Sequence, residues 1–221
     1  MRKVGIEFNR LAEKELERSL ELNPNSALAH HWKGVYLSIR GRPDEAKIEL
    51  HRALELDPSS LIIMADLGQA HYFAHEYDRA IDYCNRVLAL DPDFWVAHEY
   101  LLDIYQVKRM NDGVFNEYMY LKHRYDTVEA KQQLRETFAR GGIRAVTEQQ
   151  IDLISNLKDA GILRAKLYSR IGDREQALYW LDRGTTERRW FGTVYIYADP
   201  MFDALHDDDR FKRIVNRMGL S

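Results

Sequence analysis

A five-residue motif recurs at a fixed interval and strongly limits what this chain can fold into. It reads LELNP ending at Pro24, LELDP ending at Pro58 and LALDP ending at Pro92. The interval is 34 residues both times. Proline pushes the residue before it out of the α-helical region, so each Asn-Pro or Asp-Pro pair predicts the end of a helix. The chain is therefore expected to repeat one structural unit.

Two further columns of small residues keep the same register. Ala46 and Ala80 each lie twelve residues before a proline, and Gly34 and Gly68 are also 34 residues apart. Small residues at fixed positions let two helices approach closely. Only 5 prolines and 12 glycines occur in 221 residues, and long stretches are rich in Ala, Leu, Glu, Arg and Lys, which favour helix. The sequence predicts an all-α fold.

These columns resemble the tetratricopeptide repeat, which implies a right-handed superhelix, or α-solenoid, of antiparallel helix pairs. The resemblance is strong over residues 27–60 and 61–94. It weakens over 95–128, where Leu102 and Asp126 replace the small residue and the proline. Residues 9–24 resemble the second helix of a unit without its first helix, as in a piece of a longer protein.

The expected organisation has three parts. Residues 1–128 form the repeat array, a half repeat followed by three repeats. Residues 129–160 form a connector of two helices separated at Arg140 to Gly142. Residues 161–221 contain a repeat-like helix pair and a helical C-terminal cap. Within that cap, residues 191–198 are expected to be extended, Pro200 to open a short helix, and Asp207 to Asp209 to cap the last one.

The tail carries a second resemblance. Its sequence ADPMFDALHDDDRFKRIVNRMGL, residues 198–220, is similar to the C-terminal ends of bacterial repeat regions attached to winged-helix transcription regulators, serine/threonine kinases or adenylate cyclases. This resemblance implies the regulatory region of a larger bacterial signalling or transcription protein.

In tetratricopeptide arrays the first helix of each pair lines a concave groove. The resemblance places the following residues on that groove: Leu28, His31, Trp32, Val35, Ile62, Asp66, Gln69, Tyr72, Phe73, Val96, Glu99, Tyr100, Asp103 and Gln106. Trp and Tyr are common binding anchors, and the acids Asp66, Glu99 and Asp103 would favour a partner with Lys or Arg. The same acids oppose the cationic clamp with which co-chaperone repeats hold a C-terminal carboxylate.

Clusters that could suggest catalysis or metal binding are better explained by packing. The pair His98-Glu99 lacks the second His that a zinc protease helix needs, because residue 102 is Leu. His71 and His75 are four residues apart, but no third ligand accompanies them. Cys84 lies in a column that holds leucine elsewhere. We expect no enzyme, no metal and no cofactor.

The net charge of −3 and the single cysteine predict a cytoplasmic protein with no direct nucleic-acid binding. The sequence has no run of about 20 apolar residues, so no membrane segment is expected. The predicted function is a non-catalytic scaffold that binds a protein or peptide, with the oligomeric state left open. Two alternatives remain: residues 129–160 fill the groove, or the C-terminal half closes it into a pocket for a small ligand.

Overall fold

A computed structural model describes residues 2–123, 127–157, 159–187 and 195–219. These residues are all-α, as the sequence predicted, and they contain no strand. The elements are α1 (Arg2–Leu22), α2 (Ala27–Ile39), α3 (Pro43–Leu56), α4 (Leu61–Phe73), α5 (Tyr77–Leu90), α6 (Trp95–Val107), α7 (Asn111–His123), α8 (Val128–Leu153), α9 (Gly161–Ile171), α10 (Arg174–Glu187), the 3₁₀ helix η2 (Pro200–Leu205) and α11 (Asp209–Met218).

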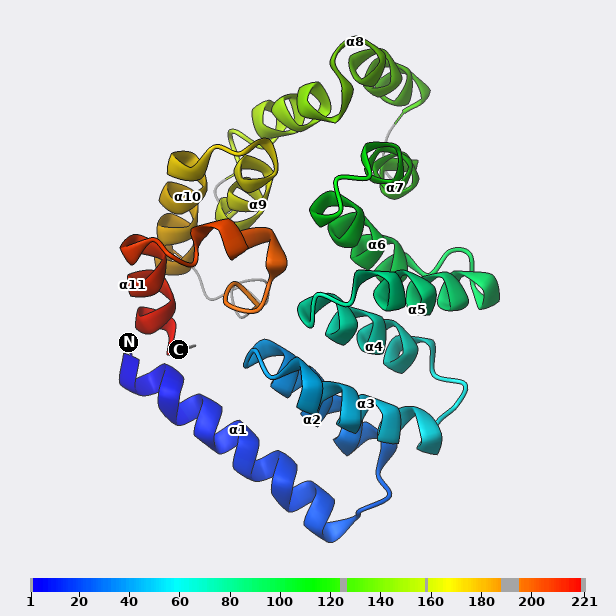
Figure 1. Ribbon diagram of the computed structural model, residues 1–221, viewed down its shortest axis with the longest axis vertical. Coiled ribbons are helices and arrows are strands. Elements are labelled where there is room, and N and C mark those ends of the chain that lie inside the picture. The colour runs from blue at the N-terminus through cyan, green and yellow to red at the C-terminus, as the bar shows by residue number, and fades with distance from the viewer. Residues whose placement is uncertain (1, 124–126, 158, 188–194, 220–221) are drawn as a thin grey trace. The chain divides into compact units, whose positions relative to one another are not determined.

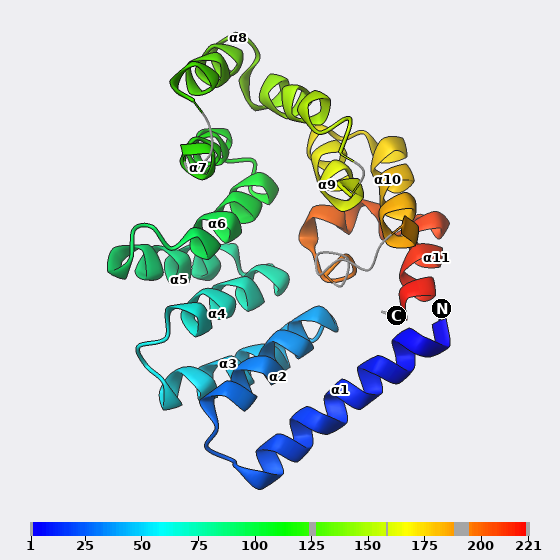
Figure 2. The same ribbon diagram turned by 180° about the vertical axis from the view of Figure 1, so that it is seen from behind.

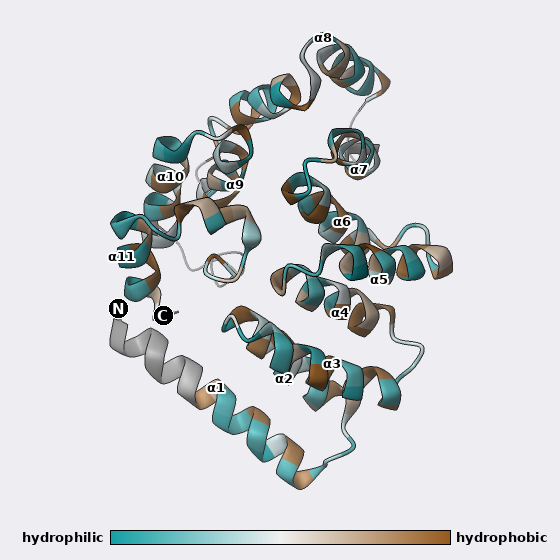
Figure 3. Cartoon of the chain, viewed as in Figure 1, coloured by the Kyte–Doolittle hydropathy of each residue, from teal (hydrophilic) through white to brown (hydrophobic). Residues whose placement is uncertain are grey.

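The chain divides into two compact units. Among the described residues, the first unit contains 2–100, 195–200 and 215–219, and the second contains the rest. In the first unit α2 pairs with α3 and α4 pairs with α5, and α3 also packs on α4 (Figures 1 and 2). Figure 3 shows that polar and apolar residues occur along the helices of both pairs. The pairs pack through a buried apolar cluster of Leu37, Ala46, Leu50, Leu67 and Ala70.

The small residues of the repeat allow the close helix crossings that the sequence predicted. A Cβ atom at Gly34 would lie 2.5 Å from Leu50 Cγ and 3.2 Å from the Ala46 carbonyl oxygen. At Gly68 it would lie 3.3 Å from the Ala80 carbonyl oxygen. Ala46, Leu50 and Ala80 are fully buried. A side chain at Gly34 would therefore separate α2 from α3.

Local signals explain where the helices begin. Ser26 caps α2, because its hydroxyl oxygen accepts a hydrogen bond of 3.2 Å from the Ala29 N–H. Pro43 opens α3, where its fixed φ suits the first turn. The prolines of the repeated motif lie in the turns between helix pairs, outside the helices. Each of these prolines therefore marks the boundary between one helix pair and the next.

The second unit contains the end of α6 and the helices α7 to α10. Its core includes Val114, Leu134 and Val146, and Phe115 stacks on Phe138 with ring centroids 4.0 Å apart. Helix α8 is two helical segments, because Gly142 has φ 61° and ψ −158°. The predicted break at Arg140 to Gly142 is confirmed.

Helices α9 and α10 form the closest pair of the second unit. A Cβ atom at Gly161 would lie 2.6 Å from the Gly184 Cα atom, so glycine on both helices permits this crossing. Arg164 donates hydrogen bonds to the carbonyls of Ser155 and Leu157, at 2.8 and 2.9 Å. Its guanidinium lies 4.2 Å from the ring centroid of Trp180. This side chain joins the segment after α8 to the α9–α10 pair.

The tail differs from one sequence expectation. Of the predicted extended segment 191–198, residues 191–194 lie outside the described residues, and residues 195–198 form turns. The prediction of extended backbone is therefore wrong for 195–198, because local backbone hydrogen bonds curl this stretch. Helix η2 begins at Pro200 as predicted. Asp208 caps α11 by accepting a hydrogen bond of 2.8 Å from the Arg210 N–H.

No helix in the described part of the chain is both long enough and apolar enough to cross a membrane.

Candidate protein-binding face

The predicted groove residues lie on α2, α4 and α6, the first helices of successive pairs. We call the surface that they form on α2, α4 and the first turns of α6 the inner face. The predicted groove residues differ in how much of each is exposed to solvent. The buried residues are His31, Asp66, Tyr72, Phe73 and Gln106. The partly buried residues are Val35, Gln69, Val96, Tyr100 and Asp103. The exposed residues are Leu28, Trp32, Ile62 and Glu99.

A hydrogen-bonded cluster joins the three helices of the inner face. The Asp66 carboxylate accepts one bond of 2.7 Å from His31 Nε2–H and another of 2.8 Å from the Tyr100 hydroxyl. His31 and Asp66 are 7% and 8% exposed. Hydrogen bonds to charged groups contribute about 1.5–3 kcal/mol each. Both oxygens of Asp66 are used inside the chain, so this acid links helices.

Two tyrosines beside Asp66 have a hydroxyl pKa that is raised above the usual value. Burial raises the pKa of the Tyr100 hydroxyl well above its usual range, and the negative charge of Asp66 raises this pKa further. Burial, followed by the charge of Asp66, raises the pKa of Tyr195 to about 12. Both hydroxyls stay protonated at neutral pH. They can therefore donate hydrogen bonds but cannot serve as bases.

The tail supplies residues that lie against the end of α4. The Tyr72 hydroxyl donates a hydrogen bond of 2.6 Å to the Asp199 carboxylate. The Phe73 ring stacks on Tyr195, with centroids 5.5 Å apart and an interplanar angle of 22°. Tyr72, Phe73 and Asp199 are 3%, 6% and 2% exposed. The last turn of α4 therefore binds a segment of its own chain.

Two further contacts hold the tail near the end of α2. Gly41 has φ 67°, and a Cβ atom there would lie 3.0 Å from the Tyr197 ring. Arg40 donates a hydrogen bond of 2.9 Å to the Gly219 carbonyl oxygen. Sequence reasoning placed the C-terminal half against the groove only as an alternative, and it did not identify these contacts of the tail. A periodic pattern says nothing about where a segment outside the pattern will lie.

The opposite end of the inner face carries exposed apolar side chains. Leu28 and Ile62 are the second residues of α2 and α4 and lie 34 residues apart. They are 66% and 38% exposed, and Trp32, one helical turn after Leu28, is 49% exposed. Exposed apolar side chains that cluster on one surface mark interaction sites more often than isolated ones do.

The acidic residues differ in what they can offer a partner. Asp66 is buried in the cluster described above. Asp103, within the second unit, forms an ion pair of 2.8 Å with Lys166. Glu99 is exposed. Sequence reasoning missed the intrachain partners of Asp66 and Asp103, which are His31, Tyr100 and Lys166. The register does contain one signal, since His31 and Asp66 occupy adjacent positions in consecutive repeats.

The histidine and cysteine positions are structural. His98 is buried and its Nε2 lies 3.0 Å from the Pro92 carbonyl oxygen. His71 Nδ1–H donates a hydrogen bond of 2.6 Å to Glu76, and His75 lies in the turn after α4 with φ 60°. Cys84 is fully buried. Among the residues that the structure describes, no group of His, Cys, Asp and Glu side chains could hold a metal ion.

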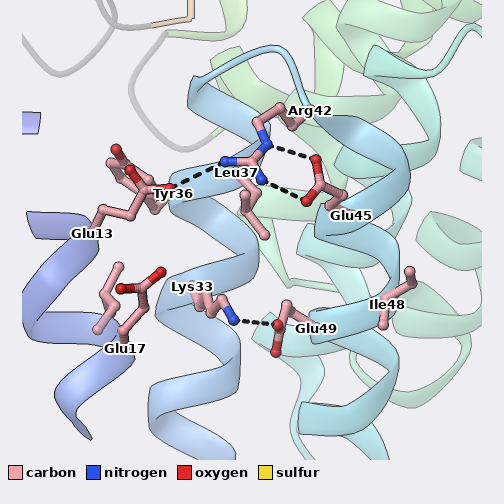
Figure 4. A pocket seen from close by; sticks show the side chains of 10 residues that line it. Glu13, Glu17, Lys33, Tyr36, Leu37, Arg42, Glu45, Ile48 and Glu49 are labelled. Carbon is pink, nitrogen blue, oxygen red and sulfur yellow. Dashed lines mark hydrogen bonds and ion pairs between the residues drawn. The ribbon is translucent and has the colours of Figure 1, made fainter. Parts of the chain in front are cut away.

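A cavity of about 190 Å³ lies between α1, α2 and α3 (Figure 4). Charged side chains line it and pair with one another: Arg42 bridges Glu13 and Glu45, and Lys33 pairs with Glu49 at 2.7 Å. Sites for small molecules usually measure about 300–1,000 Å³ and are mainly apolar. This cavity is smaller and more polar than such a site.

Comparisons with known proteins agree with the repeat register. Family models described as tetratricopeptide repeat match residues 37–102 and residues 15–48. No curated protein sequence matches the chain. A crystal structure of a tetratricopeptide repeat protein from Parabacteroides merdae matches with a TM-score of 0.52 and 16% sequence identity, covering 98% of this chain and 91% of that chain. The chain thus has tetratricopeptide repeats over residues 15–102 and a fold similar to that of a known repeat protein.

Proposed function

We propose that the chain is a non-catalytic scaffold that binds a segment of another protein on the inner face. Tetratricopeptide repeats generally mediate protein–protein interaction and are typically non-catalytic. The observation that most supports the proposal is the exposure of three large apolar side chains, Leu28, Trp32 and Ile62, on the first helices of consecutive repeats. Leu28 and Ile62 lie in the first turns of these helices, and Trp32 lies one turn after Leu28.

The contact between α4 and the tail adds support. Tyr72 and Phe73 already hold a short segment of polypeptide through one hydrogen bond and one aromatic contact. The inner face therefore presents groups suited to a peptide at one end and exposed apolar groups at the other. Large apolar side chains at the open end would gain about 25 cal/mol for each Å² of apolar surface that a partner covers.

We also propose the kind of protein to which this chain belongs and the charge of the partner's residues. The similarity of the tail to bacterial regulatory proteins supports a role as the regulatory region of a larger signalling or transcription protein. Of the three predicted acids, Glu99 is the exposed one. A preference for Lys or Arg in the partner would therefore depend mainly on Glu99.

A selection experiment tests the proposal. Phage displaying random 12-residue peptides would be panned against the full chain, and the affinity of the enriched peptides would be measured by fluorescence polarisation. We expect Leu28→Ala to weaken binding at least fivefold. Leu90→Ala is the matched control, because Leu90 is 67% exposed, like Leu28 at 66%, but lies at the end of α5.

The control should bind like the wild type. If no peptide is enriched, or if Leu28→Ala and Leu90→Ala bind equally well, the inner face is not the binding surface.

A further inference from the structure

Residues 195–199 form one helical turn. The Ala198 N–H and the Asp199 N–H both donate hydrogen bonds to the Tyr195 carbonyl oxygen, at 3.0 and 2.9 Å. Residues four positions apart lie on the same side of such a turn. The turn therefore presents the Tyr195 ring and the Asp199 carboxylate together.

Two adjacent residues at the end of α4 receive these two groups. Tyr72 donates its hydroxyl hydrogen to Asp199, and Phe73 stacks on Tyr195. Both receiving side chains are more than nine-tenths buried. A hydrogen bond to a carboxylate inside a protein depends strongly on distance and direction. Tyr72 and Phe73 together therefore favour a segment that carries an aromatic ring and, four residues later, a carboxylate.

The tail covers one end of the inner face and leaves the other exposed. Tyr72 and Phe73 are the last residues of α4, whereas Leu28 and Ile62 lie in the first turns of α2 and α4. A longer polypeptide that runs along these helices could contact both ends. It would bury more apolar surface than residues 195–199 do, and so could replace them.

We propose that the end of α4 recognises, in a partner protein, a helical turn with an aromatic residue followed four positions later by a carboxylate, and that residues 195–199 occupy this site until such a partner displaces them. This inference rests on the proposed function and names the partner's chemistry. Leu28, Trp32 and Ile62 would bind the partner's flanking apolar residues.

A labelled peptide tests the site directly. The probe is Tyr-Ile-Tyr-Ala-Asp-Pro, which copies residues 195–200 and carries a fluorophore at its N-terminus. Its affinity would be measured for the wild-type chain and for the full chain with Tyr195→Ala and Asp199→Asn, in which the competing segment is weakened. We expect the double variant to bind the peptide at least tenfold more tightly than the wild type does.

A second substitution in the double variant identifies the receiving residue. Tyr72→Phe should weaken peptide binding at least fivefold, because it removes the hydrogen bond to the carboxylate. Tyr179→Phe is the control, since Tyr179 is 52% exposed on α10 and has no part in the site. If circular dichroism shows that the double variant is unfolded, Asp199→Asn alone keeps the side-chain shape and should still bind at least threefold more tightly than the wild type.

Equal affinity of the wild type and the variants for the peptide would overturn the proposal, as would binding that ignores Tyr72. A dimer at high protein concentration that Asp199→Asn abolishes would also overturn it, because the site would then belong to the tail of a second copy. If phage-selected peptides require Leu28 but neither carry the motif nor depend on Tyr72, the proposed function stands and this inference fails.

Discussion

Tyr72 and Asp199 are separated by 127 residues in the chain and joined by a buried hydrogen bond of 2.6 Å. One belongs to the repeat array and the other to the tail that follows it. This bond places the tail on the same helices that carry the predicted binding residues. The inner face is thus both a candidate binding surface and a surface that the chain already uses.

Removal of this hydrogen bond should destabilise the first unit. We expect Tyr72→Phe to lower the free energy of unfolding by about 1–3 kcal/mol, because the buried Asp199 carboxylate loses a donor. Urea denaturation followed by circular dichroism measures the change. Tyr179→Phe, at an exposed position, should change stability by less than about 0.5 kcal/mol. Equal effects of the two substitutions would show that the bond contributes nothing.

Adding a methyl group at Gly34 or Gly68 should lower the stability of the fold by different amounts, according to the space around each glycine. Gly34→Ala should cost about 1–3 kcal/mol, since the new Cβ atom would lie 2.5 Å from Leu50 Cγ. Gly68→Ala should cost less, because its nearest neighbours lie 3.2–3.3 Å away. Thermal melting of both variants checks the order. A smaller loss for Gly34→Ala would contradict the packing described for α2 and α3.

Acid should weaken the contacts around Glu76. Hydrogen bonds from Lys47 and His71 lower the pKa of the Glu76 carboxyl to about 2. Because the folded pKa is below the unfolded value of about 4.3, the stabilisation is present above pH 4.3 and is lost as pH falls toward 2. The side chain is 34% exposed, so solvent screening limits the effect to about 1 kcal/mol or less.

The matched measurement compares stability at pH 7 and pH 3. Glu76→Gln should reduce the dependence on pH over this range, and Glu55→Gln should leave it as in the wild type, because Glu55 forms an exposed ion pair with Arg52. An unchanged dependence in Glu76→Gln would rule out this carboxyl as a source of acid sensitivity.

Tyr100 should be important for the fold. Tyr100→Phe removes one of the two hydrogen bonds that we describe at the buried Asp66, so we expect a loss of about 1–2 kcal/mol in the free energy of unfolding. Urea denaturation measures it. A variant as stable as the wild type would show that the second bond, from His31, is sufficient to satisfy Asp66.

The sequence predicted the helix pairs because their determinants are local and periodic. Gly34, Ala46 and Pro58 each have a counterpart 34 residues later, and each has a steric role that follows from its residue type. The break at Gly142 was also predicted from a local signal. These positions required no knowledge of distant contacts.

The remaining features depend on contacts that periodicity does not encode. Asp66 and Asp103 were predicted to attract a basic partner, but His31, Tyr100 and Lys166 bind them within the chain. The position of Asp199 against Tyr72 depends on how the tail returns to the array. A charged residue in a repeat column can face a ligand or a neighbouring helix, and only the structure distinguishes the two.

The affinity of a phage-selected peptide for Trp32→Ala, measured together with the melting temperature of this variant, tests the central claim most directly. Trp32 is half-exposed and stacks on His31, so Trp32→Ala should stay folded with a melting temperature about 2–6 °C below the wild type, because the lost contact costs about 1–2 kcal/mol. The same change should weaken peptide binding at least tenfold, because a large apolar anchor is lost. Unchanged peptide affinity in a folded Trp32→Ala chain would contradict a binding surface on the inner face.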